Sequence, residues 1–147
     1  MGLVQFTEKV LRLWRSMRFV EAPHMALGRR GEQIAAGYLQ RHGHKILRCN
    51  FRAPYGGEVD LVCRDRRCGE LVFVEVKTRS SEEFGRPLDA VDKKKRQLIL
   101  RGAMKWLHML GMPDITYRFD VIEVIAGESF EVRHIENAFQ VPEHFVY

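Results

Sequence analysis

The sequence predicts an α/β domain built in the order α-β-β-β-α-β-β. Two apolar stripes recur at helical spacing, and five short segments rich in β-branched and aromatic residues lie between turn-forming residues. The 147 residues, 46% of them hydrophobic and 29% charged, suit one folded domain of ordinary size and exclude a disordered or fibrous chain. We therefore expect a single domain over residues 25–147, without internal repeats.

Residues 1–24 form a segment ahead of that domain. Within residues 3–20, apolar side chains recur at helical spacing and Lys and Arg fill the other side, which predicts an amphipathic basic helix closed by Pro23. We expect this helix to dock on the domain or on a second copy, so a homodimer is left open. Contact with a membrane surface or with nucleic acid is the alternative. No apolar run approaches the roughly 20 residues of a membrane-spanning helix, so no integral span is expected.

An apolar stripe predicts the first helix of the domain, over residues 25–42. Gly43 follows it at the position of a C-cap glycine. The stripe consists of Leu27, Gly31, Ile34, Ala35, Tyr38 and Leu39.

Three strands are predicted next, at residues 45–51, 58–64 and 71–77. Turn residues at 54–57 and 66–69 separate them, each stretch containing glycine.

A polar loop over residues 78–86 precedes a second long helix. The apolar positions of that helix run from Val91 to Leu110, Gly111 ends it and Pro113 blocks its continuation. Residues 116–125 and 130–135 are the last two predicted strands, joined by a turn at 126–129.

Net charge and cysteine usage indicate the kind of partner and the cellular compartment to expect. The formal charge of +5 and a pI near 9.3 favour polyanionic partners. Cys49, Cys63 and Cys68 form no CxxC pair, and no nearby histidine completes a set of four zinc ligands. We expect structural thiols in a reduced, cytoplasmic protein.

The third predicted strand carries charges on one of its two faces. The period of two places Phe73, Glu75 and Lys77 together, with Glu75 and Lys77 about 7 Å apart along the strand. Glu-Lys pairs are abundant and usually form solvated salt bridges. In a buried strand, however, an isolated charge costs several kcal/mol or more, so such a pair is expected to face a polar cleft.

Asp60, on the preceding strand, completes a candidate catalytic set. Two carboxylates about 4 Å apart repel each other by roughly 4 kcal/mol at an effective dielectric of 20, a cost that a divalent cation or a shared proton relieves. Oxygen-ligated Mg²⁺ supports phosphodiester hydrolysis, so we expect Asp60 and Glu75 to hold Mg²⁺ or Mn²⁺. Lys77 is then placed to orient water or to stabilise the charged transition state.

Four spaced motifs resemble the bacterial YraN family over roughly residues 25–125. They are Gly28-Arg29-Arg30-Gly31-Glu32, Gly57-Glu58-Val59-Asp60-Leu61, Phe73-Val74-Glu75-Val76-Lys77-Thr78-Arg79 and Arg118-Phe119-Asp120-Val121. That family in turn resembles restriction-endonuclease-like nucleases, in particular archaeal Holliday-junction resolvases, through an Asp, a Glu-x-Lys and a Glu on the preceding helix. The resemblance implies an αβββαβ core with a central mixed sheet flanked by helices, here with an extra C-terminal strand. Val59 departs from the proline often found before that Asp.

The resemblance implies a catalytic set of Glu32, Asp60, Glu75 and Lys77, with Glu32 acting through a water or helping to activate the nucleophile. Asp120, within the fourth motif, is interpreted as a structural partner of a basic residue. Basic residues near the cleft would neutralise DNA phosphates without reading sequence. These are Arg79, Arg86, Lys93, Lys94 and Arg96.

The expected function is a Mg²⁺-dependent DNA endonuclease, structure-selective and acting on branched or damaged DNA. Zinc-finger and nucleotide-loop motifs are missing from the sequence, so sequence-specific readout and a small-molecule cofactor are not expected. One alternative is a nucleic-acid-binding protein of nuclease fold whose cleavage is weak, partner-dependent or lost. Another is a membrane-apposed adaptor that uses residues 3–20.

Overall fold

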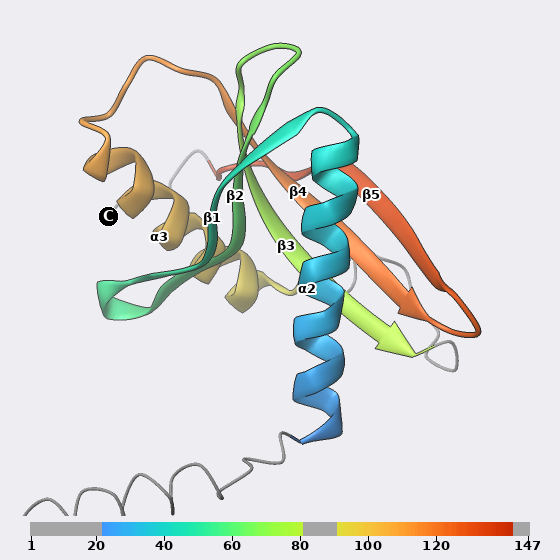
Figure 1. Ribbon diagram of the computed structural model, residues 1–147. Coiled ribbons are helices and arrows are strands. Elements are labelled where there is room, and N and C mark those ends of the chain that lie inside the picture. The colour runs from blue at the N-terminus through green and yellow to red at the C-terminus, as the bar shows by residue number, and fades with distance from the viewer. Residues whose placement is uncertain (1–21, 81–90, 143–147) are drawn as a thin grey trace, which may run out of the picture.

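The computed structural model describes residues 22–80 and 91–142, and its arrangement is drawn in Figure 1. The predicted helix at 3–20 and Arg86 lie outside the described residues. The elements are α2 (Pro23–Arg41), β1 (His44–Ala53), the short 3-10 turn η1 (Pro54–Gly56), β2 (Gly57–Asp65), β3 (Leu71–Ser80), α3 (Lys93–Met109), β4 (Tyr117–Ala126) and β5 (Phe130–Phe139). Their order confirms the predicted α/β fold.

The five strands form one mixed sheet in the order β1-β2-β3-β4-β5. Neighbouring strands are antiparallel except for β3 and β4, which run parallel and are joined through α3. A parallel pair needs a long crossover connection, and α3 lies within it. The mixed sheet flanked by helices is therefore confirmed.

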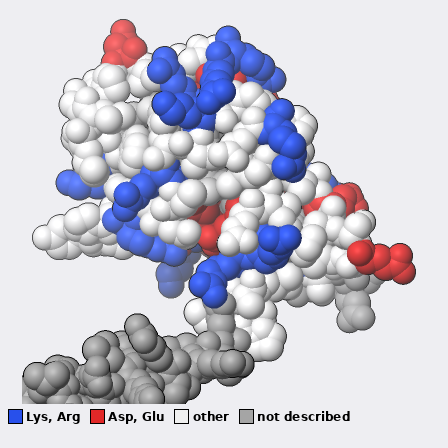
Figure 2. Space-filling model, in the orientation of Figure 1, with Lys and Arg blue, Asp and Glu red and all other residues white. Residues whose placement is uncertain are grey.

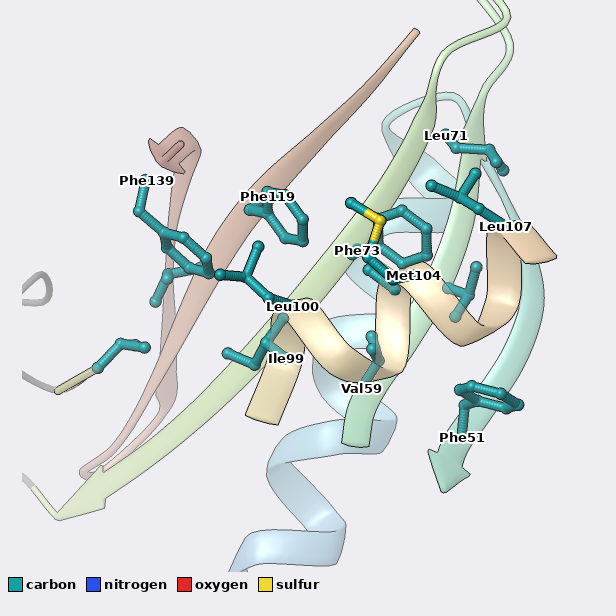
Figure 3. Close-up of a cluster of buried hydrophobic side chains, with 14 residues drawn as sticks. Phe51, Val59, Leu71, Phe73, Ile99, Leu100, Met104, Leu107, Phe119 and Phe139 are labelled. Atoms are coloured by element: carbon teal, nitrogen blue, oxygen red, sulfur yellow. The ribbon is translucent and has the colours of Figure 1, made fainter. Parts of the chain in front are cut away.

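The α3 helix packs on one face of the sheet through its apolar stripe. Ile99, Leu100 and Leu107 meet Phe73 and Phe119 in a buried cluster (Figure 3). The rings of Phe73 and Phe119 stack with centroids 5.6 Å apart, in the range of favourable aromatic pairs. At the start of α3, the Asp92 carboxylate accepts a hydrogen bond from the Lys95 backbone N–H at 2.8 Å, a standard N-cap. The first turn of α3 is thus fixed relative to the sheet.

The α2 helix covers the opposite face. Its buried residues Ala35 and Leu39 pack against Val72, Val74 and Ile122 in a second apolar cluster. The two clusters follow the alternation of β3, whose residues 72, 74 and 76 face α2 while residue 73 faces α3.

Two glycines of α2 differ in their surroundings, and this gives a first testable prediction. A Cβ at Gly31 would lie 1.8 Å from Thr78 Oγ1, whereas a Cβ at Gly28 would meet nothing within 4 Å. Gly31→Ala is expected to destabilise the protein by about 1–3 kcal/mol through overpacking. Gly28→Ala is expected to stabilise it by about 0.5–1 kcal/mol through helix propensity.

Urea unfolding of the two variants measures both effects. Adding Thr78→Ala to Gly31→Ala should recover part of the loss, because the hydroxyl is the nearest atom. Equal stabilities of the two single variants would contradict the assigned close approach of α2 and β3.

Candidate functional site

The candidate site lies where β2 and β3 separate. Their ladder runs from Arg64 opposite Leu71 to Leu61 opposite Val74 and goes no further, although both strands continue. At this point the Asp60 carboxylate accepts a hydrogen bond from the backbone N–H of Val76, at 2.9 Å. Asp60 is 7% exposed. A side chain therefore replaces the backbone partner that β3 loses.

Glu75 stands next to this junction with its side chain on the α3 face. It is 2% exposed, and its Oε1 lies 2.9 Å from the Lys77 ammonium. The predicted same-face pairing of Glu75 and Lys77 is confirmed. The other oxygen, Oε2, is buried and has no hydrogen-bond partner among the described residues. A buried acceptor without a partner is costly, which makes this oxygen a candidate ligand for a cation.

The electrostatics of Glu75 also fit a divalent cation. Burial, and after it the neighbouring Asp60 carboxylate, raises the pKa of Glu75 to about 7, against the opposing effect of Lys77 and Lys95. Two neighbouring carboxyl groups, one of them with an unsatisfied oxygen, form the oxygen-rich surroundings that Mg²⁺ or Mn²⁺ prefers. The residues present therefore fit the expected ion, and the assignment of Asp60 and Glu75 as its ligands stays a prediction.

Lys95 and Glu58 also belong to this cluster, and the sequence did not place Lys95 in it. Lys95, from the first turn of α3, places its ammonium 3.4 Å from Glu75 Oε1 and also pairs with Glu58. Burial tends to lower the pKa of Lys95, but Glu58 and then Glu75 and Asp60 raise it above its ordinary value. Glu58 pairs with Arg52 as well. One signal was available in the sequence: a lysine in the first turn of a helix opposes the helix dipole and needs an acidic partner.

Glu32 occupies the other side of the sheet. Its Oε2 accepts a hydrogen bond from the Asn50 side chain at 2.9 Å. It also lines a pocket of about 220 Å³ together with Val76 and Thr78, on the face covered by α2. Residues 22–80 and 91–142 contain no group of three or more His, Cys, Asp and Glu side chains that could hold one ion. A role for Glu32 through a water therefore stays a prediction.

The basic residues proposed to contact DNA differ in how free their charges are. Lys93 and Lys94 are exposed at the start of α3. Arg79 is 3.1 Å from the buried carboxylate of Glu123. Arg96 donates to the backbone carbonyl of Val91 and lies over the Phe139 ring. In Figure 2 a small acidic area is sunk near the middle of the face, with Lys and Arg side chains around it.

A second charged cluster lies nearer the start of β3 and is structural. Arg118 contacts the carboxylates of Asp120, Glu70 and Asp65, and His134 contacts Asp120. Asp120 is fully buried. Burial alone would raise the pKa of Asp120, but hydrogen bonds from His134, Asn137 and Arg118 hold it below its usual value. The interpretation of Asp120 as a partner of a basic residue is confirmed.

The raised pKa of Glu75 predicts how the metal-free protein responds to pH. A carboxyl group whose pKa is about 7 when folded and 4.5 when unfolded disfavours folding increasingly as the pH rises from 4.5 to 7, by about 3 kcal/mol in all. Glu75→Gln removes this penalty. The variant is therefore expected to gain stability relative to wild type between pH 5 and pH 8.

Urea unfolding at both pH values in EDTA measures the difference. Glu131→Gln is the control, because Glu131 is exposed and pairs only at the surface with Arg133. A gap between wild type and Glu75→Gln that is equal at pH 5 and pH 8 would show that Glu75 titrates normally.

Comparison with known proteins places the chain among one set of relatives. Residues 31–124 match the family described as "Uncharacterised protein family UPF0102". A UPF0102 protein of Trichlorobacter lovleyi is 43% identical over 127 residues, covering 85% of this chain and 98% of the relative. One from Syntrophotalea carbinolica is 48% identical over 118 residues, covering 80% and 94%. No helix in the described part of the chain is long and apolar enough to cross a membrane.

Proposed function

The chain belongs to the UPF0102 family, the YraN-type family that its motifs resemble, and we propose that it is a Mg²⁺-dependent DNA endonuclease. The observation that carries the proposal is the buried Glu75 carboxylate. One of its oxygens is held by Lys77 and the other has no described partner, beside the Asp60 carboxylate. Two neighbouring carboxylates with an adjacent ammonium are the groups that metal-assisted phosphodiester hydrolysis requires.

Each residue of the site has a separate task in this proposal. Asp60 and Glu75 would hold the ion, which supplies positive charge to the phosphate and acidifies a coordinated water. The hydrogen bond from Val76 fixes one Asp60 oxygen and so orients the carboxylate. Lys77, with its side chain 30% exposed, reaches from Glu75 toward solvent, where it can orient the attacking water or stabilise charge on the transition state.

The proposed substrate is DNA recognised by shape, including branched DNA, and not by sequence. The exposed Lys93 and Lys94 begin the helix whose first turn also carries Lys95 to Glu75. Phosphate contacts by such lysines give affinity without sequence information.

DNA binding is therefore expected to weaken steeply with salt. Each neutralised phosphate contributes about 0.9 log unit of affinity per log unit of salt on a duplex. Lys93→Gln with Lys94→Gln should flatten this slope by roughly twice that amount. Arg96→Gln should change it less, because the Arg96 guanidinium already bonds to Val91 and covers Phe139. Fluorescence anisotropy across a salt series measures the slopes. DNA binding whose affinity does not change with salt would contradict the assignment of a phosphate-contact surface.

Cleavage assays test the activity directly. Purified wild-type protein is incubated with labelled linear, flapped, single-stranded and four-way DNA in Mg²⁺ or Mn²⁺. Cleavage that EDTA stops and that favours a branched substrate supports the proposal. DNA binding without any cleavage in either ion would overturn it.

One observation favours a second candidate, a DNA-binding protein of nuclease fold with weak or partner-dependent cleavage. Glu75 already lies within reach of two ammonium groups, and its pKa of about 7 leaves it partly protonated at neutral pH. Both features weaken a carboxylate as a metal ligand. The same assay separates the two candidates, since this one predicts salt-dependent DNA binding with little or no product.

A further inference from the structure

Lys95 is the charged residue of the cluster that comes from outside the sheet. Glu58, Asp60 and Glu75 bring three carboxylates to the junction of β2 and β3. Lys77 and Lys95 bring two ammonium groups. Lys77 lies two positions from Glu75 on the same strand, so its pairing follows from strand geometry alone. Lys95 is delivered by α3 and contacts two carboxylates, Glu58 and Glu75.

The position of Lys95 is built into the fold. The Asp92 N-cap fixes the first turn of α3, and the apolar stripe of the helix fixes the rest. The Lys95 side chain is only 22% exposed. A half-buried ammonium between carboxylates neutralises them at a place where isolated charges would be costly.

On the premise that Asp60 and Glu75 form a divalent-ion site, we propose that Lys95 is the resident counter-cation of that site. Its ammonium stabilises Glu58 and Glu75 while no ion is bound, and it moves toward Glu58 when an ion takes up the charge of Glu75. Lys95 therefore sets the affinity of the site for the ion. It is a positioning residue that acts through Glu75.

The geometry favours Lys95 over Lys77 as the exchangeable cation. The Lys95 ammonium lies 3.4 Å from Glu75 Oε1, against 2.9 Å for Lys77, so its contact with Glu75 is the looser of the two. Lys95 also keeps a second partner, Glu58, if it leaves Glu75. Lys77 has no other ion-pair partner among the described residues.

Replacing Lys95 by methionine should have opposite effects on the metal-free protein and on metal binding. Without the ammonium, the carboxylates repel one another, so the thermal midpoint in EDTA should fall. A divalent ion no longer shares the site with a positive charge, so Mn²⁺ should bind on the order of tenfold more tightly or better. The stabilisation gained on adding Mn²⁺ should be larger than in wild type, because a tighter ligand raises stability by mass action.

Calorimetric titration with Mn²⁺ at pH 8, beside thermal unfolding with and without the ion, measures these quantities. Lys95→Arg keeps the charge and should stay close to the wild-type affinity. Lys105→Met removes the same charge from an exposed position ten residues later on the same helix, about 15 Å along its axis, and should change neither quantity. Lys95→Gln serves as a second neutral variant should the methionine variant fold poorly.

The outcomes separate this inference from the proposed function. In one outcome, wild type binds Mn²⁺ through Asp60, and the folded variants Lys95→Met and Lys95→Gln bind it equally or more weakly. That outcome overturns the role of Lys95 but leaves the metal site standing. Tighter binding by the neutral variants supports that role, even where wild type cleaves no DNA. Binding that is undetectable in wild type and in both neutral variants removes the metal site and the role of Lys95 together.

Discussion

Replacing Asp60 by asparagine is expected to abolish divalent-ion binding and DNA cleavage while DNA affinity stays intact or rises. The change removes the charge of one of the two proposed ligands, and a bound ion contributes several kcal/mol to a phosphoryl transition state, so cleavage should fall by about 10³-fold or more. DNA affinity should not fall, because the lost carboxylate repels phosphate when no ion is present. Calorimetry with Mn²⁺ and cleavage of a labelled four-way junction measure both effects.

Asparagine is the informative substitution because Asp60 also has a structural role. Its side-chain oxygen can still accept the hydrogen bond from Val76 that the Asp60 carboxylate accepts. Asp60→Ala leaves that buried N–H without a partner and should lose about 1–3 kcal/mol of stability in addition. If the asparagine variant bound Mn²⁺ and cut DNA as wild type does, Asp60 would not be a ligand.

Replacing Arg118 by methionine is expected to cause the largest loss of stability, about 3–5 kcal/mol. Removing one partner of a buried ion pair leaves an uncompensated charge, and here Asp120 loses the guanidinium that bonds to it, whereas Asp65 keeps the closer guanidinium of Arg67. Asp120 is fully buried and Asp65 nearly so. Urea unfolding at pH 7.5 measures the loss.

Arg133→Met is the matched control. Arg133 also pairs with a buried carboxylate, that of Glu123, but its own side chain is 50% exposed and Arg79 lies closer to Glu123. Its replacement should cost less than about 1 kcal/mol. Similar losses for the two arginine variants would contradict the assignment of Arg118 as the centre of a buried network.

The order of elements could be predicted because each depends on the periodicity of its own residues. The strand ends could not. β3 was predicted to end at residue 77 but continues to Ser80, and β5 was predicted to end at 135 but continues to Phe139. The extension of β3 is polar, and its residues 78–80 pair with β4 through the backbone. The extension of β5 begins with the polar residues Glu136 and Asn137, which interrupt the apolar pattern before Ala138 and Phe139. Backbone pairing does not require apolar side chains, so hydrophobic pattern underestimates strand length.

Only those contacts of the site that depend on the spacing of residues within one strand could be predicted. The pairing of Glu75 with Lys77 follows from the strand period and is present. The contact of Lys95 with Glu58 spans 37 positions of sequence and depends on where α3 packs, which no local pattern encodes. Glu32 lies on a helix that covers the opposite face from α3, and a sequence alone does not assign helices to faces.

The hydrogen bond of Asp60 with Val76, beside its proposed role as a ligand, bears on how this protein would change if selection for its chemistry were relaxed. Asp60 fills the backbone position that β3 loses beyond Val74, so its loss would cost stability even in a descendant that hydrolyses nothing. Glu75 is the reverse case, because its buried charge lowers the stability of the metal-free protein. Mutational drift should therefore erase Glu75 first and retain Asp60 longest. In a comparison of relatives, a retained Glu-x-Lys would then indicate an active enzyme. A retained aspartate without it would indicate only that the fold is kept.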